Sequence, residues 1–234
     1  MFKGVCKIVF MDNIKGFIET SFVDWPGRTC AVLFLGGCNF RCPFCHNHPL
    51  VLAPNELISL SIDEIIEQLQ PLKKWLGGVC VSGGEPTLDP ALPELLGILQ
   101  REGFSTKIDT NGSRPEILAA LLEHNLLDMI SMDVKSTLVQ EEYDKCAGVK
   151  VDLVKIRRSI EIIKKSKVAH EFRMTVLPKF HTLKQIVTWA DVLGRGASLK
   201  LQNYNPGSPL SPDLAGYSGF SLDEFEELLG IVRN

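Results

Sequence analysis

The sequence lacks the marks of nucleic-acid-binding, membrane-spanning and disordered chains. It has 25 Lys and Arg against 28 Asp and Glu, and the formal net charge of −3 leaves no basic face for a phosphate backbone. The longest apolar run, Cys30–Leu35, is far shorter than the ~20 residues that span a bilayer. A hydrophobic fraction of 45% excludes disorder, and 234 residues can bury one full core. We therefore expect a soluble cytoplasmic protein without a nucleic-acid or membrane partner.

The cysteines do not form the even, distributed set that a disulfide-rich secreted chain shows. There are seven, and three of them lie close together at Cys38, Cys42 and Cys45. The other four are scattered along the chain at Cys6, Cys30, Cys80 and Cys146. This distribution indicates a metal site in a reducing compartment.

Short apolar runs of strand length alternate with longer amphipathic stretches from residue 29 onward. Strands are predicted at Thr29–Gly36, Gly78–Ser82, Ser105–Thr110, Asp128–Lys135, His170–Leu177 and Ser198–Tyr204. Helices are predicted at Ser61–Leu76, Pro90–Glu102, Pro115–His124, Leu153–Lys165, Leu183–Leu193 and Ser221–Val232. About six βα units use nearly all of the chain, which is too short for an eight-unit barrel with an added domain. The pattern predicts an α/β fold, a partial and open (β/α)6 parallel barrel.

The first 28 residues are expected to precede this core as a separate segment. Two short strands are predicted within Cys6–Val23, around a turn at Asp12 and Asn13, as a β flap beside the barrel. Residues 29–234 form the core, and a loop rich in Pro, Gly and Ser leads to its C-terminal helix. Three helices are expected to begin with capping boxes, at Ser61 and Glu64, Ser113 and Glu116, and Ser221 and Glu224. Since β-to-α loops carry the chemistry of such folds, functional residues are expected at the carboxyl ends of the strands.

The segment Gly36–Val51 holds its three cysteines in the spacing C-x3-C-x2-C, directly after the first core strand. Pro43 would cost a helix ~3 kcal/mol, so a loop around an ion or a cluster is expected. Thiolates are soft, anionic ligands that hold zinc or iron–sulfur clusters. Zinc would need a fourth ligand such as His46 or His48, and no second cysteine or histidine pair follows. A four-iron cluster would keep one iron without a protein ligand, which is what binding a substrate to iron requires.

Three motifs together resemble one enzyme superfamily. The cysteine spacing, with Phe44 before the last cysteine, resembles the signature of the radical S-adenosylmethionine (SAM) superfamily. Cys45–Asn47 and the upstream Asp24–Gly27 are similar to elements of its glycyl-radical-enzyme activating proteins, nearest the group called anaerobic ribonucleoside-triphosphate reductase activating proteins. Trp25 departs from the small residue or tyrosine expected in that group. The resemblance implies a barrel of the radical SAM type, a [4Fe–4S] cluster on Cys38, Cys42 and Cys45, and cofactor contacts by Phe44 and His46.

Two further strand ends resemble cofactor-binding motifs of the same superfamily. The second core strand is followed by Ser82, Gly83, Gly84 and Glu85, which the resemblance places at the methionine moiety of SAM. The third core strand ends in Asp109, Thr110 and Asn111, which the resemblance places beside the cofactor. A glycine pair is also an ordinary way to reverse the chain, and a plain left-handed turn would use the same residues as the second motif.

Charged side chains recur at the ends of the next two strands. Asp133 and Lys135 share one face by the strand period of two, and a structural ion pair would explain them. The resemblance implies instead that they are catalytic residues near SAM and a bound substrate peptide, and it adds Arg173 to the cofactor site. The remaining histidines, His124, His170 and His181, have no clustered partners and are predicted to be ordinary surface or core residues.

The resemblance implies an enzyme that reductively cleaves SAM at the cluster to a 5′-deoxyadenosyl radical. The radical would install a glycyl radical on a partner enzyme, such as an anaerobic ribonucleotide reductase, with flavodoxin or ferredoxin as the one-electron donor. One alternative is a radical SAM enzyme that acts directly on a small metabolite or peptide, such as a deazaguanine-type synthase. A second alternative is a non-catalytic zinc-binding protein.

Overall fold

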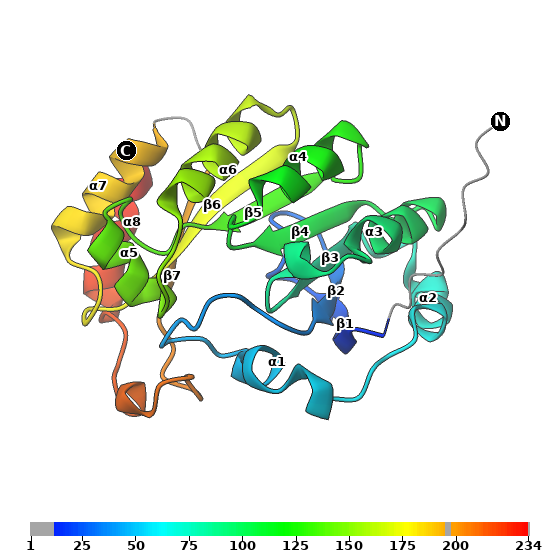
Figure 1. The fold of residues 1–234 in the computed structure, drawn as a ribbon, viewed down its shortest axis with the longest axis horizontal. Coiled ribbons are helices and arrows are strands. Elements are labelled where there is room, and N and C mark those ends of the chain that lie inside the picture. Colours follow the sequence, from blue (N-terminus) through cyan, green and yellow to red (C-terminus); the bar gives the residue numbers. More distant parts are fainter. Residues whose placement is uncertain (1–11, 195–197, 234) are drawn as a thin grey trace.

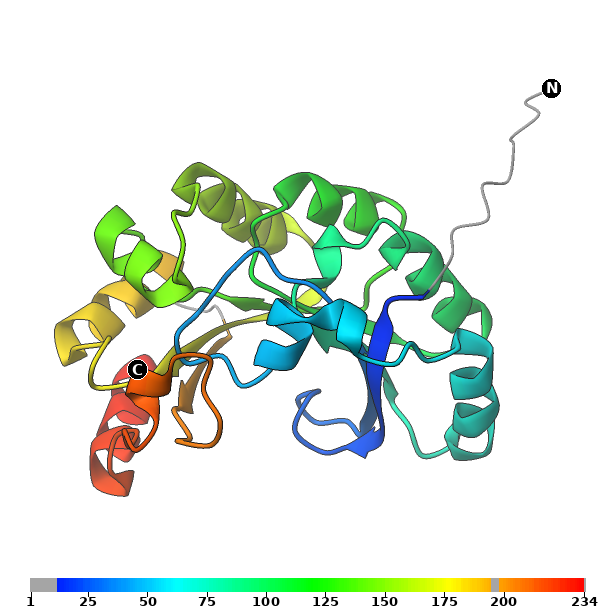
Figure 2. The same ribbon diagram turned by 60° about the horizontal axis from the view of Figure 1, so that its bottom comes forward.

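The computed structural model describes residues 12–194 and 198–233 and contains one seven-stranded sheet. Its strands are β1 (Ile14–Ser21), β2 (Cys30–Leu35), β3 (Gly78–Gly83), β4 (Thr106–Thr110), β5 (Met129–Asp133), β6 (Ala169–Val176) and β7 (Leu199–Asn203). They follow one another across the sheet in chain order, β1 antiparallel to β2 and every later pair parallel. The sheet curves into an open part-barrel (Figures 1 and 2), which confirms the predicted α/β fold.

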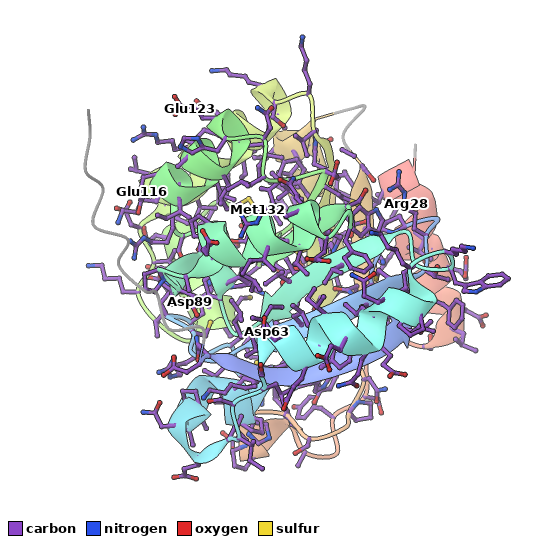
Figure 3. All side chains as sticks on the ribbon, turned by 90° about the vertical axis from the view of Figure 1, so that its right-hand side faces the viewer. Arg28, Asp63, Asp89, Glu116, Glu123 and Met132 are labelled. Carbon is purple, nitrogen blue, oxygen red and sulfur yellow. The ribbon has the colours of Figure 1, made fainter. Side chains whose placement is uncertain are left out.

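The sheet is accompanied by helices, and all of those described except the first cover its convex face (Figure 2). They are α1 (His48–Leu52), α2 (Ile62–Leu69), α3 (Leu92–Arg101), α4 (Pro115–Glu123), α5 (Gln140–Ala147), α6 (Leu153–Lys165), α7 (Leu183–Leu193) and α8 (Leu222–Arg233). Single 3-10 turns lie at Pro54–Glu56, Gln70–Leu72, Pro86–Leu88 and Pro212–Leu214. Figure 3 shows Asp63 on α2 and Glu116 and Glu123 on α4, on the exposed side of this helical layer. No helix in the described ranges is long and apolar enough to cross a membrane.

The N-terminal strand belongs to the sheet. Residues of β1 pair with β2 from Ile14 opposite Leu35 to Ser21 opposite Cys30, so β1 is an edge strand of the barrel. The first of the two predicted N-terminal strands falls in residues 1–11 and lies outside the described residues. Asn13, at the predicted turn, donates from its side-chain amide to the carbonyl of Gly36 at 3.0 Å. The division of the chain at residue 28 stays a prediction.

The N-termini of the helices confirm one of the three predicted capping boxes. Ser221–Glu224 forms the predicted capping box, and Thr182–Gln185 forms a complete box that was not predicted. The box predicted at Ser61 is wrong, because its hydroxyl makes no capping bond. The box predicted at Ser113 is wrong as well, because its hydroxyl accepts a hydrogen bond of 2.9 Å from Asn39, in the loop that carries Cys38, Cys42 and Cys45 (the cysteine loop). The helices α1 and α5 are unpredicted because both are short and carry little apolar periodicity.

The two faces of the sheet have different chemistry, because successive residues of a strand point to opposite sides. Outward side chains such as Leu33, Val81 and Ile130 join the main core that the helices cover. Inward side chains make a smaller apolar cluster of Trp25, Cys30, Val32, Cys80 and Met129. Buried charged side chains, among them Lys107, Glu171 and Arg173, alternate with the core residues of their strands and are therefore on the inner face. The inner face is thus where a functional site can form.

Candidate active site

The three clustered cysteines lie on an irregular loop between β2 and α1, as the sequence predicts. Main-chain hydrogen bonds fix this loop to distant parts of the chain, and one runs from the amide of Arg41 to the carbonyl of Ala147 at 2.8 Å. The amide of Leu210 donates to the carbonyl of Cys45 at 3.0 Å, and that of Ser211 donates to the carbonyl of Pro43 at 2.9 Å. The conformation of the cysteine loop therefore depends on α5 and on the segment before α8.

The sulfur atoms of the loop line a cavity of about 490 Å³ at the carboxyl ends of the strands. Cys38, Cys42 and Cys45 all contribute to its wall, and all three are free thiols. Burial raises the pKa of each thiol, so a bound cation has to supply the stabilisation of the thiolates. Three soft sulfur donors on one cavity wall fit an iron–sulfur cluster.

The same residues do not fit a single zinc ion. In the described part of the chain, no three His, Cys, Asp or Glu side chains converge on one point, as a mononuclear site requires. Both histidines proposed as fourth ligands are engaged elsewhere: His46 Nε2 lies 2.8 Å from the carbonyl of Asn205, and His48 Nε2 lies 3.3 Å from the hydroxyl of Ser208. The donor set therefore favours a cluster that spans the loop over a zinc ion held by three cysteines and a histidine.

The glycine motif after β3 lies against the cysteine loop, and both glycines are required there. A Cβ at Gly84 would overlap the carbonyl of Gly37, and a Cβ at Gly83, where φ is +122°, would overlap the backbone of Leu35. The amide of Glu85 donates to the carbonyl of Gly37 at 2.8 Å. Ser82, Gly83 and Gly84 all line the cavity, which places the backbone of this motif where a ligand can reach it.

The side chain of Glu85 does not line the cavity, and a contact between Glu85 and the cofactor stays a prediction. It is 1% exposed, and its carboxylate accepts from the amide of Asn111 at 2.6 Å and from the hydroxyls of Thr87 and Thr110. Burial raises its pKa, and these hydrogen bonds act in the opposite direction. Glu85 therefore holds the end of β4 through hydrogen bonds on the side away from the cavity, while Thr110 and Asn111 line the cavity itself.

Asn111 joins the third strand end to the cysteine loop. Its side-chain amide donates to Asn39 Oδ1 at 2.9 Å and lies 3.9 Å from Cys38 Sγ. Its own Oδ1 accepts from the amide of Ser113 at 2.9 Å. The sequence places Asn111 at the site, but it does not show that this side chain holds the cysteine loop in place.

An alternating row of charges crosses the inner ends of β4, β5 and β6. Lys107 pairs with Asp109, and Arg173 donates from Nη1 to Asp109 at 3.1 Å and from Nε to Asp133 at 2.9 Å. Lys135 Nζ lies 3.0 Å from Asp133. Although burial acts against them, the Arg173 and Lys charges keep the pKa of Asp109 and Asp133 below the ordinary value. Both aspartates are therefore held as carboxylates, and the ion pair expected for Asp133 and Lys135 forms within the cavity wall.

A model of one protein family matches residues 32–190, which covers the cysteine loop and the strand ends described above; it is the Radical SAM superfamily. The chain belongs to the radical SAM superfamily. Members of this family are enzymes that use a [4Fe–4S] cluster and SAM, and these are the cofactors of this chain.

Two relatives are similar to this chain over part of its length. A protein of Methanocaldococcus jannaschii, named "Putative glycyl-radical enzyme activating enzyme MJ1227", is 35% identical over 169 residues, covering 71% of this chain and 69% of its own. The pyruvate formate-lyase-activating enzyme of Staphylococcus aureus (strain USA300) is 33% identical over 123 residues, covering 48% of this chain. The match spans about half (49%) of the Staphylococcus protein.

Two solved structures share the fold at low sequence identity. The structure of TYW1 with a lysine-pyruvate adduct bound has a TM-score of 0.58 and 17% identity, covering 87% of this chain and 72% of that one. Native anSMEcpe with bound AdoMet has a TM-score of 0.57 and 20% identity, covering 84% of this chain and 57% of that one. These similarities show the fold, an open part-barrel.

Two predicted cofactor contacts of this radical SAM protein, Phe44 and His46, flank Cys45 and line the cavity. The Phe44 ring packs edge-on against Phe180, with centroids 5.7 Å apart. The His46 ring stacks on Tyr204 at 5.7 Å. Both aromatic side chains are thus held by segments that follow β6 and β7.

Several cavity residues were not assigned to the site from the sequence. They are Asp24, Phe34, Phe40, Asn47, Val51, Thr175, Gln202, Asn203 and Asn205. Thr175 and Gln202 were detectable, because Thr175 shares a strand face with Arg173 and Gln202 alternates in the same way on β7. Asp24 belongs to the Asp24–Gly27 element and lines the cavity, whereas its neighbour Trp25 is buried in the inner apolar cluster. The loop residues could not be found, since only the folded chain brings them to the cavity.

Proposed function

We propose that this radical SAM enzyme installs a glycyl radical on a partner enzyme. The observation that carries the proposal is the cavity in which the three cysteines meet the glycine motif and the row of charges. Its other ligand-type side chains are engaged by protein groups: Asp109 and Asp133 by cations, His46 by Asn205, and Asp24 by the hydroxyl of Ser21 at 2.5 Å. A four-iron cluster held by the three cysteines would therefore keep one iron without a protein ligand, and SAM would bind there.

Each part of the cavity wall has a proposed task. Cys38, Cys42 and Cys45 hold the cluster, and the exposed backbone of Gly83 and Gly84 binds the amino acid end of SAM. Asp133, Lys135 and Arg173 offer fixed charges to SAM and to the substrate backbone, and their mutual ion pairs hold them in place before either arrives. When bound, the cluster and SAM together supply the radical that abstracts a hydrogen atom from a glycine Cα. The protein keeps competing hydrogen donors away from it.

A polypeptide substrate is supported by the loop beside the cavity. Phe22 and Val23 precede the cavity residue Asp24 and are 78% and 74% exposed. Large apolar side chains held at a cavity rim are typical of surfaces that a partner protein covers. The relatives named as activating enzymes point to the same class of partner, a glycyl radical enzyme. Anaerobic ribonucleotide reductase is one candidate, and flavodoxin or ferredoxin would supply the electron.

The test mixes the reconstituted protein, SAM and dithionite with each purified glycyl radical enzyme of the host under anaerobic conditions. We expect a glycyl doublet by electron paramagnetic resonance with one of them, together with one 5′-deoxyadenosine per radical. Release of 5′-deoxyadenosine without a doublet on any of these enzymes would overturn the activating role and favour direct action on a small metabolite or peptide. No release at all would contradict SAM cleavage itself.

A further inference from the structure

The buried imidazole of His181 lies beneath the site, in the turn that follows β6. It is 1% exposed, and it is absent from the residues that line the cavity. Its backbone amide donates to the carbonyl of Leu177 at 2.9 Å, while the amide of Leu177 donates back to His181 Nδ1 at 3.2 Å. Ring and backbone are therefore fixed together.

These contacts determine which ring nitrogen carries the proton. Burial lowers the pKa of His181, so the ring is neutral, and Nδ1 is an acceptor because it receives the Leu177 amide. The proton is consequently on Nε2, which lies 3.0 Å from the carbonyl of Lys135 and donates to it. The thiol of Cys146 lies 3.5 Å from the same nitrogen.

The same ring also packs against an aromatic residue of the cysteine loop. Its centroid is 6.4 Å from that of Phe44, at an interplanar angle of 63°. Phe44 stands between Cys42 and Cys45, and Phe180 completes the aromatic group beneath it. One side chain thus touches both the loop that carries the thiols and the backbone that carries Lys135.

The backbone at Lys135 needs such a support because β5 ends at Asp133. The carbonyl of Val134 accepts from Trp189 Nε1 at 3.1 Å, and the amide of Val134 donates to the carbonyl of Arg173 at 2.9 Å. The next carbonyl, that of Lys135, accepts from His181. We propose that His181 is a positioning residue that holds Lys135 in register with the cysteine loop, so that the Lys135 ammonium meets SAM. This inference rests on the proposed function, which makes SAM the ligand of Lys135.

Three variants separate the hydrogen bond from the ring. His181→Gln can keep a donor near the position of Nε2, His181→Asn can keep only an acceptor near Nδ1, and His181→Phe keeps the ring alone. We expect His181→Phe and His181→Asn to raise the KM for SAM about tenfold, the effect of one lost buried hydrogen bond, with kcat within about threefold of wild type. His181→Gln is expected to return KM to within about threefold of wild type. The assay is 5′-deoxyadenosine release without a partner enzyme, with the exposed His124→Phe as the control.

A second readout needs neither cluster nor SAM. Nitrogen-15 NMR of the cluster-free protein is expected to show His181 as the neutral Nε2–H form. Carbon-13 NMR is expected to show a shifted Lys135 carbonyl resonance in His181→Phe and His181→Asn and an unshifted one in His181→Gln. An Nδ1–H form, an unmoved Lys135 carbonyl, or equal losses of kcat in all three variants with KM unchanged would overturn the inference. If His181→Phe does not fold, the comparison of His181→Asn with His181→Gln tests the inference. A wild-type protein that releases no 5′-deoxyadenosine would refute the proposed function, while the NMR result would still decide what His181 holds.

Discussion

The outer and inner faces of the same strands differ in how they use their residues. On β2, Leu33 faces the helices and is fully buried in the main core, while its neighbour Val32 packs against Trp25 on the inner face. On β4, Ile108 lies in the core, whereas the buried Lys107 forms an ion pair with the partly buried Asp109. Alternation lets each strand contribute to stability with one side and to chemistry with the other. Substitutions on the two faces should therefore separate folding from function.

The largest effect on activity is expected from the cysteine loop. Cys42→Ala should abolish 5′-deoxyadenosine release, because two thiolates do not retain a four-iron cluster. Cys146→Ala is the matched control: this buried thiol lies 3.5 Å from His181 Nε2 and does not line the cavity. Anaerobic iron analysis and the deoxyadenosine assay measure both effects. Equal losses in the two variants would contradict the assignment of the ligands.

A smaller but still large effect is expected at the contact between the glycine motif and the cysteine loop. A Cβ at Gly84 would overlap the carbonyl of Gly37, so Gly84→Ala has to displace the loop and should lose most of its bound iron after desalting. Gly207→Ala is the control, because nothing lies within 4 Å of the Cβ that it adds. Full iron retention in Gly84→Ala would show that the loop tolerates the displacement.

Breaking the row of charges should weaken SAM binding more than it slows turnover. Arg173→Met removes a buried cation from between Asp109 and Asp133 and leaves two partly buried carboxylates with one partner each, at a cost of about 3–5 kcal/mol in the free energy of unfolding. Released 5′-deoxyadenosine as a function of SAM concentration should show a raised KM. Unchanged KM and unchanged stability would refute the role of the row.

The same variant should change the acid sensitivity of the fold. In the wild type, the pKa of Asp109 and Asp133 is lower in the folded than in the unfolded chain, so their contribution to stability is complete above pH ~4 and is lost as the pH falls below it. Without the Arg173 charge the two pKa values rise, and this contribution shrinks. Urea unfolding at pH 7 and pH 3 should show a smaller difference for Arg173→Met than for the wild type.

A substitution on the outer face of the sheet should lower the stability of the fold and leave turnover unchanged. Leu33→Ala creates a cavity in the main core and should lower the free energy of unfolding by about 2–5 kcal/mol, measured by urea denaturation. Turnover per bound cluster should stay at the wild-type level. A fall in turnover as large as the fall seen in Arg173→Met would mean that the two faces are not independent.

The sequence predicts this site well where a motif is local. C-x3-C-x2-C, the glycine pair and the strand-end charges at Asp133 and Lys135 each lie within a few residues, and the structure brings all of them to one cavity. The sequence does not predict the contacts that a side chain makes with residues far away in the chain. Glu85 lies next to the glycines, but its carboxylate binds the amide of Asn111 and does not line the cavity. The hydroxyl of Ser113 accepts a hydrogen bond from Asn39 and does not cap the helix.

The contacts of His181 are a further example of what the sequence does not predict. Nothing in its neighbourhood marks it, since its partners Phe44 and Lys135 are more than 40 residues away in the sequence. A lone histidine is therefore predicted to be ordinary, and only its position in the folded chain reveals two contacts with the site.

The hydrogen bonds from Leu210 and Ser211 to the cysteine loop set a limit on how far the chain can be shortened. The family match ends at residue 190, so a fragment cut there would keep every motif and would still lose both donors. The carbonyls of Pro43 and Cys45 would then have only solvent to bind, next to sulfur atoms that must meet iron in a fixed arrangement. The smallest autonomous unit of this protein is therefore longer than its recognisable signature, and a minimal catalyst would have to retain the last strand and the turn beyond it.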